Sequence, residues 1–219
     1  MPVLLGLLAP LQAVNDVRLG IGRRLGAIAI GLMVVCIIVQ VFWRYVLNNA
    51  LPWPEEAARF LMLWMTGLVA PLAYRRGGFV AIDTLKALMP RTVAAALSLL
   101  LLSLAMLVLV MAVQLGHDHV FKNCLFRSSS LYLPFTLEFA VPIPFTGLDL
   151  SLCTRASPSF GFEWGWTKMP LPLAFLSLWV GVLLLTAVNV ELILRELVAI
   201  LGGADRLRPM FDADLPGDV

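Results

Sequence analysis

The chain has 219 residues, of which 60% are hydrophobic and only 14% are charged, with a formal net charge of +2 and a mean hydropathy of +0.91. Ordinary soluble domains carry roughly 25% charged residues, so this composition excludes a typical soluble globular protein. Nothing in so weakly charged a chain points to a nucleic-acid partner. The composition indicates an integral membrane protein in contact with lipid.

Four apolar segments have the length of membrane-spanning helices. Crossing a hydrocarbon core of about 30 Å takes roughly 20 helical residues at about 1.5 Å each. The second segment is shorter and has Arg59 in its first turn, where a long side chain reaches the headgroups while its stem stays in lipid. We therefore expect an all-α fold with four transmembrane helices. The segments are Leu25–Trp43, Ala57–Tyr74, Thr92–Gly116 and Leu171–Val190.

The basic residues predict the orientation of these helices. With four spans, both termini and the 75–91 connection share one side of the membrane. That side carries ten Lys and Arg residues, most of them close to span ends, and the other side carries six. The positive-inside rule therefore predicts that both termini are cytoplasmic. The ten are Arg18, Arg23, Arg24, Arg75, Arg76, Lys86, Arg91, Arg195, Arg206 and Arg208.

The spans divide the chain into five parts. A cytoplasmic N-terminal segment, 1–24, precedes the first three helices in 25–116, and an extracytoplasmic loop, 117–170, leads to the fourth helix in 171–194 and a cytoplasmic tail, 195–219. The N-terminal segment lacks a basic start and Pro10 interrupts its apolar stretch, so no signal-peptide cleavage is expected. Its apolar residues Leu11, Val14, Val17 and Ile21 recur at helical spacing opposite Asn15, Asp16 and Arg18. This pattern fits either a helix in the cytoplasmic interface or an unstructured terminus.

The 117–170 loop is far longer than a turn. Its apolar stretch Leu131–Phe145 contains three prolines, which indicates a re-entrant or surface-lying structure and not a fifth span. On an oxidising side of the membrane, Cys124 and Cys153 could form a disulfide, or both could remain free thiols. Cys36 lies within the first span, where a cysteine behaves as a small hydrophobic residue.

No catalytic or cofactor motif stands out in the sequence. The span interiors lack Asp, Glu, Lys and His, which transporters usually carry at their binding sites. His117 and His119, two apart just after the third span, are expected to be solvated and not ligands. We therefore expect no enzymatic activity, no cofactor and no metal, and a chain that does not transport a solute alone.

Small residues predict where the helices pack. Gly22 and Gly26, Ala27 and Gly31, and Ser177 and Gly181 each stand four residues apart, a spacing that lets helix backbones approach closely in lipid. Such spacings also occur by chance, so they indicate helix contacts without identifying the partner.

The densest group of charges stands at the start of the second span. Two prolines and the acids Glu55 and Glu56 suit a helix N-terminus, and Glu55 reaches Arg59 at i,i+4. Helix capping alone explains these charges. A polar cluster that braces neighbouring helices explains them equally well.

Several motifs resemble the small membrane subunit, DctQ type, of tripartite ATP-independent periplasmic (TRAP) transporters. The resemblance covers about residues 25–115 and returns weakly in the fourth span. Phe79 stands where the family tends to have His, and the loop is longer than is usual. The motifs are Arg44-Tyr45, Trp53-x-Glu55-Glu56-x-x-Arg59, Leu63-Trp64-Met65 and the run from Ala73 to Asp83.

The resemblance implies a scaffold in the bacterial inner membrane. In such systems a periplasmic binding protein captures an organic acid, a large membrane subunit moves it with sodium, and the small subunit braces the large one. Trp43, Trp53 and the loop would face the docked binding protein. Residues implied at subunit interfaces are Arg44, Trp53, Glu55, Glu56, Arg59, Trp64, Arg75, Arg76 and Asp83.

Two other classes of protein are alternatives. A membrane-anchor subunit of a respiratory enzyme would also form four helices, although it should have His residues within its spans. A small lipid-modifying enzyme would need polar groups at one interface, and only His117, Asp118 and His119 are candidates.

Overall fold

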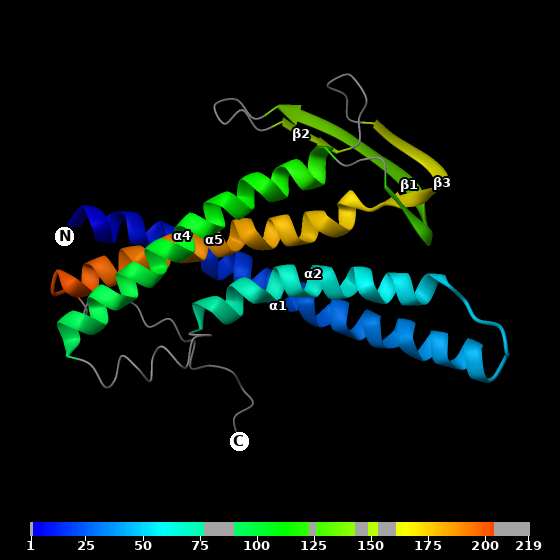
Figure 1. Ribbon diagram of the computed structural model, residues 1–219, viewed down its shortest axis with the longest axis horizontal. Helices are drawn as coiled ribbons and strands as arrows, with labels where there is room; N and C mark the ends of the chain where they lie inside the picture. The colour runs from blue at the N-terminus through cyan, green and yellow to red at the C-terminus, as the bar shows by residue number, and fades with distance from the viewer. Residues whose placement is uncertain (1, 77–89, 123–125, 143–148, 153–160, 204–219) are drawn as a thin grey trace.

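Four long helices and one small sheet make up the computed structural model of the chain, which describes residues 2–76, 90–122, 126–142, 149–152 and 161–203 (Figure 1). All four helices are long and apolar enough to cross a membrane, as predicted, and they contain nearly all of the predicted spans. Only Leu171 falls outside, as the N-cap of the last helix. The helices are α1 (Pro2–Tyr45), α2 (Trp53–Arg75), α4 (Arg91–Lys122) and α5 (Pro172–Ile200).

Helix α1 is one continuous helix of 44 residues, so residues 2–24 extend the first span without a break and Pro10 lies inside the helix. Val14, Val17 and Ile21 point away from the other helices and are 43%, 63% and 53% exposed, whereas Gln12 and Asn15 are buried. The N-terminal segment thus buries Leu8 and Leu19 together with Gln12 and Asn15 against the rest of the protein. Val14, Val17 and Ile21 face outward, as suits contact with lipid.

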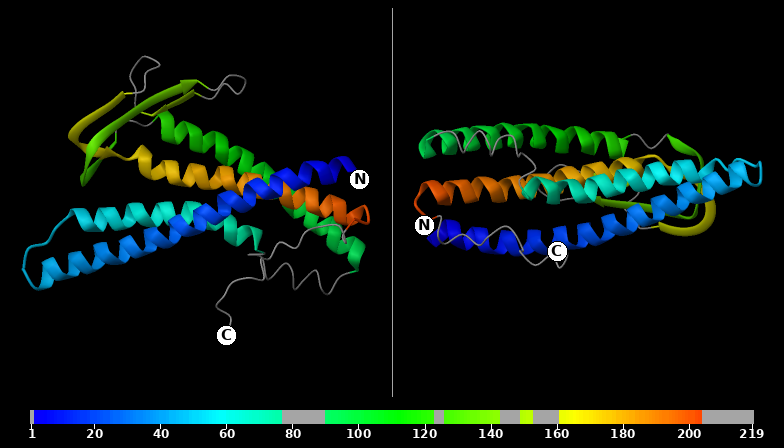
Figure 2. Two further views of the ribbon diagram at one scale, coloured as in Figure 1. Left: turned by 180° about the vertical axis from the view of Figure 1, so that it is seen from behind. Right: turned by 90° about the horizontal axis from the view of Figure 1, so that it is seen from below.

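The helices form two antiparallel pairs, α1 with α2 and α4 with α5, joined by extensive contact between α2 and α5. Helices α1 and α4 cross in Figure 1, and beyond the crossing the two pairs diverge toward the end that holds the sheet (Figures 1 and 2). Helices α2 and α5 therefore form the centre of the protein.

Glycines set the closest helix contacts. A Cβ atom added at Gly67 would lie 2.3 Å from the Ser177 carbonyl oxygen, and one at Gly181 would lie 2.7 Å from the Gly67 carbonyl oxygen. A Cβ atom at Gly26 would lie 2.5 Å from a Val69 methyl group. The predicted packing roles of Ser177 with Gly181 and of Gly22 with Gly26 are therefore confirmed. Gly31, by contrast, has nothing within 4 Å.

The region between α4 and α5 contains a three-stranded antiparallel sheet of order β2-β1-β3, which the sequence analysis did not predict. The pairing of β1 with β3 shifts register between Leu133 and Phe135. Pro134 lies between them and has no N–H to donate to a ladder, which suits such an irregularity. The strands are β1 (Arg127–Pro142), β2 (Asp149–Leu152) and β3 (Gly161–Pro170).

Two expectations for this region change. Helix α4 continues six residues beyond Gly116, so His117 and His119 lie on a helix and not in a loop. His117 is 6% exposed because it packs against Phe121 and Trp179, which corrects the expectation that it is solvated. His119 is exposed, as expected. Cys124 and Cys153 lie outside the described residues.

Candidate functional site

A cluster of polar side chains joins α1, α2 and α5 near the N-terminal end of the protein. We call Asn15, Asp16, Arg75, Glu191 and Arg195 the Arg75 cluster. The guanidinium of Arg75 donates to Glu191 Oε1 from Nη2 at 2.7 Å and from Nε at 3.2 Å, and it also pairs with Asp16. Asn15 Nδ2 donates to Glu191 Oε2 at 2.7 Å, and Arg195 lies 3.9 Å from Glu191 Oε1.

Burial makes this cluster electrostatically strong. The Glu191 side chain is 0% exposed and that of Arg75 is 9% exposed, whereas Asp16 on the rim is 63% exposed. Two carboxylates and two guanidiniums balance in charge. A buried ion pair is stable only when its remaining hydrogen-bonding positions are filled, and Asn15 fills one on Glu191. The cluster is thus a closed network that holds helices together.

A second series of hydrogen bonds connects α4 to the other helices. The Tyr74 hydroxyl donates to Asn189 Oδ1 at 2.6 Å, and Asn189 Nδ2 donates to the Leu102 carbonyl oxygen at 3.1 Å. Asn189 is 0% exposed. Adjacent residues of α2, Tyr74 and Arg75, therefore connect to all three of the other helices.

The predicted cluster of Glu55, Glu56 and Arg59 divides into two interactions. Glu55 forms an ion pair with Arg59, as the i,i+4 spacing predicts, and both side chains are exposed, by 53% and 75%. Glu56 turns toward the sheet instead. Its carboxylate accepts hydrogen bonds from the Ser130 backbone N–H at 2.9 Å, from the Ser129 backbone N–H at 3.3 Å and from the Ser130 hydroxyl. Glu56 therefore fastens the start of α2 to β1.

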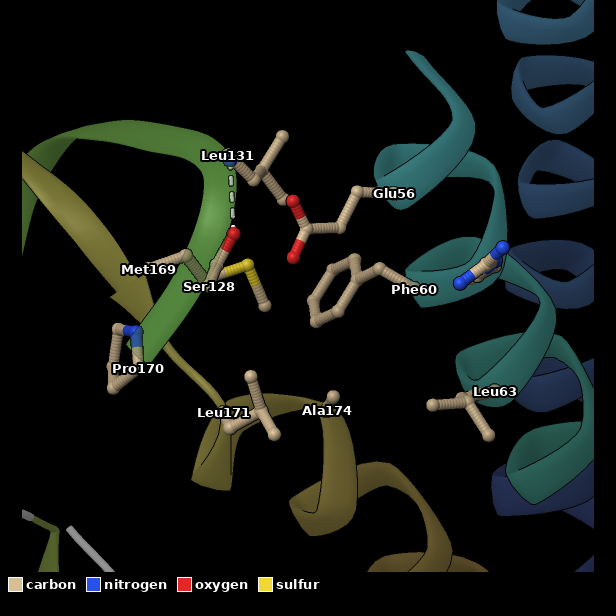
Figure 3. Close-up of a pocket in the computed structure, with 10 residues that line it drawn as sticks. Glu56, Phe60, Leu63, Ser128, Leu131, Met169, Pro170, Leu171 and Ala174 are labelled. Carbon is tan, nitrogen blue, oxygen red and sulfur yellow. Dashed lines mark hydrogen bonds between the residues drawn. The ribbon is translucent and has the colours of Figure 1, made fainter. Parts of the chain in front are cut away.

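A pocket of about 100 Å³ lies beneath this attachment, between α2, the sheet and the start of α5 (Figure 3). Glu56 and Ser128 are at its polar rim, and the Ser128 hydroxyl accepts a hydrogen bond from the Leu131 N–H at 2.8 Å. The rest of the wall is largely apolar. It includes Phe60, Leu63, Leu131, Met169, Pro170, Leu171 and Ala174.

The other predicted interface residues are spread over the protein. Arg44 and Trp53 lie at the ends of α1 and α2 that flank their connecting turn, and the Arg44 guanidinium stands 5.8 Å from the Tyr45 ring centre. The Trp64 ring packs edge-on against Phe60 within α2, and its buried N–H has no acceptor among the described residues. Arg76 is exposed, and Asp83 lies outside the described residues.

Sequence reasoning missed Glu191, Asn189 and Tyr74. The predicted fourth span ended at Val190, whereas α5 continues to Ile200 and carries Glu191 inside it. The missed signal was Asn189 in an apolar run, followed by Glu191 and by Arg195 at i,i+4. Among the described residues, no three His, Cys, Asp or Glu side chains come together as metal ligands would.

The comparisons with known proteins give one match. The sequence matches the family described as tripartite ATP-independent periplasmic transporters, DctQ component, over residues 33–200. No curated protein and no solved structure matches the chain. The family is one of transporter components and not of enzymes, and it gives no support to an anchor subunit of a respiratory enzyme.

Proposed function

We propose that this chain, which belongs to the DctQ family of TRAP transporter components, works as a rigid brace for the large membrane subunit. Membership of the family makes it a small membrane subunit of such a transporter. The transporter takes up an organic acid with sodium in the bacterial inner membrane, after a periplasmic protein delivers the acid. Both termini of the small subunit are cytoplasmic in this proposal. Its partners are the large subunit, the binding protein and lipid.

The Arg75 cluster is the observation that carries the proposal of a brace. It ties α1 and α5 to α2, and the neighbouring Tyr74 ties in α5 and α4 through Asn189. Glu191, fully buried, is held by Arg75 and Asn15. Removing one member of such a buried pair typically costs about 3–5 kcal/mol, so the network opposes movement between helices. This favours a scaffold over a part that moves with the solute.

The exposed pair Glu55 and Arg59 is the proposed contact with the large subunit. Both side chains lie at the start of α2, and Gln40 of α1 reaches Glu55 at 3.5 Å. An exposed ion pair contributes little to the stability of its own chain, so its proposed role is in partner binding. Trp53, 41% exposed beside the α1–α2 turn, would face the docked binding protein.

Co-purification tests this interface. Replacing Arg59 or Glu55 with Ala should reduce recovery of the large subunit with the tagged small subunit and lower uptake in proportion. Arg18→Ala, which removes an exposed charge in the N-terminal half of α1, is the matched control and should leave recovery unchanged. Full recovery of the complex with abolished uptake would place these residues in the transport step and contradict the brace.

Thiol labelling tests the orientation. In a cysteine-free background, single cysteines near Arg76 and Arg206 should resist a membrane-impermeant reagent in whole cells, and one at Ser129 should react. Labelling near Arg76 in intact cells would reverse the proposed topology.

A further inference from the structure

The sheet has one face that neither the brace nor the pocket uses. Tyr132 pairs directly with Lys168 across β1 and β3, so the two side chains share a face. Trp166, two residues from Lys168 on the same strand, lies on that face as well. We call Tyr132, Trp166 and Lys168 the outer sheet face. The opposite face holds Met169, which is buried and lines the pocket.

The outer sheet face is strongly exposed. Trp166 is 77% exposed and Tyr132 is 51% exposed, and Lys168 is exposed beside them. Phe126 and Arg127, at the start of β1, are exposed too. Three large aromatic rings and two cations are therefore exposed on strands β1 and β3 and at the residue before β1, which is unusual for a surface that meets only water.

Two hydrogen-bonded contacts place this sheet at the level where the helices enter the membrane. The Leu171 N–H, at the N-cap of α5, donates to the Phe126 carbonyl oxygen at 3.1 Å. Glu56, in the first turn of α2, binds Ser130. The α1–α2 hairpin reaches farther along the long axis of the protein than the sheet does in every view (Figures 1 and 2). The sheet therefore extends past the ends of α4 and α5 but not past the α1–α2 hairpin, so it lies at the level of the span ends (Figures 1 and 2).

We propose that the outer sheet face, with Phe126 and Arg127, lies in the headgroup layer of the extracytoplasmic leaflet and binds anionic phospholipid. Trp and Tyr concentrate at this depth, where the ring contacts acyl chains and its polar atom reaches water. Arg127 and Lys168 place cations at the level of the lipid phosphates. The proposal rests on the four membrane-spanning helices and on their proposed orientation, and not on which solute the transporter carries.

Tryptophan fluorescence tests the position of the face. The full chain is placed in lipid nanodiscs containing phospholipid brominated on the acyl chain near the headgroup, and Trp166→Phe is compared with the unchanged chain. Because bromine quenches only nearby rings, the substitution should remove a bromine-quenched part of the emission and leave the iodide-quenched part unchanged. If Trp166→Phe instead removes emission that iodide quenches, Trp166 faces water and the proposal is wrong. If added binding protein also shields that emission from iodide, the face is a docking surface for the binding protein.

Native mass spectrometry tests the lipid charge. The Arg127→Gln, Lys168→Gln double variant should bind phosphatidylglycerol more weakly by about fivefold for each charge removed, with phosphatidylcholine binding unchanged. Arg59→Gln is the matched control, because Glu55 already neutralises that guanidinium. Equal loss in the control, or no preference of the unchanged chain for phosphatidylglycerol, would contradict anionic lipid binding at this face.

Discussion

Both ends of α2 carry an arginine paired with a glutamate, yet the two pairs have opposite environments. Arg75 and Glu191 are buried between helices, with exposed fractions of 9% and 0%, whereas Arg59 and Glu55 are exposed by 75% and 53%. Desolvation makes a buried charge costly once its partner is removed, and water screens an exposed one. The same two residue types therefore hold the helices together at the Arg75 end of α2 and remain available to a partner at the Arg59 end.

The largest expected effect comes from breaking the buried pair. Glu191→Ala leaves the Arg75 guanidinium with only the exposed Asp16, so the stability of the protein should fall by about 3–5 kcal/mol. Thermal unfolding in detergent measures the loss. Arg76→Ala, next in sequence but exposed, is the control and should change little.

Replacing both members of the pair sharpens this result. Buried ion pairs exchanged for apolar residues of similar size are often neutral or stabilising. The double variant Arg75→Met, Glu191→Met should therefore be more stable than Glu191→Ala. A double variant that is less stable than Glu191→Ala would show that the unpaired Arg75 charge is not the cause of the loss in the single variant.

The next largest loss of stability is expected at the contact between α2 and α5, midway along α2. Gly67→Leu places a side chain against the Ser177 backbone, where even a Cβ atom would lie at 2.3 Å, so the helices must separate. Overpacking typically costs about 1–3 kcal/mol, and the upper end is expected because the clash is with backbone. Gly31→Leu, with nothing within 4 Å, should be tolerated in the same unfolding assay.

The sequence predicted the parts of the fold that follow from periodicity and length. Apolar runs predicted the four helices, and the small-residue spacing predicted a close helix contact at Ser177 and Gly181, although not that its partner is α2. The Arg75 cluster escaped prediction because its members are far apart in sequence, as Asn15 and Glu191 are, and meet only when the helices pack. The sheet escaped because its prolines argue against regular structure, and the register shift at Pro134 accommodates one of them.

A smaller effect is expected where α2 meets the sheet. Glu56→Gln keeps the shape of the side chain but weakens its hydrogen bonds with Ser129 and Ser130, since bonds to a charged acceptor contribute about 1.5–3 kcal/mol and neutral ones about 1 kcal/mol. The sheet should open more often by about tenfold, which hydrogen exchange at the Ser129 and Ser130 amides measures. Glu55→Gln, at the neighbouring residue, should leave both amides protected. Equally fast exchange in that variant would show that Glu56 is not the residue that attaches α2 to the sheet.

The smallest effect on folding is expected at the exposed pair. A double-mutant cycle on Glu55 and Arg59 should give a coupling energy of roughly 0.3–0.5 kcal/mol in the isolated small subunit, because an exposed i,i+4 pair is screened by water and salt. The same cycle, measured as recovery of the large subunit, should give a larger coupling if a partner covers the pair and removes water from it. A coupling of several kcal/mol in the isolated subunit would mean that the pair is a structural contact like Arg75 with Glu191. The contrast between the two ends of α2 would then disappear, and with it the argument that places the subunit interface at Glu55 and Arg59.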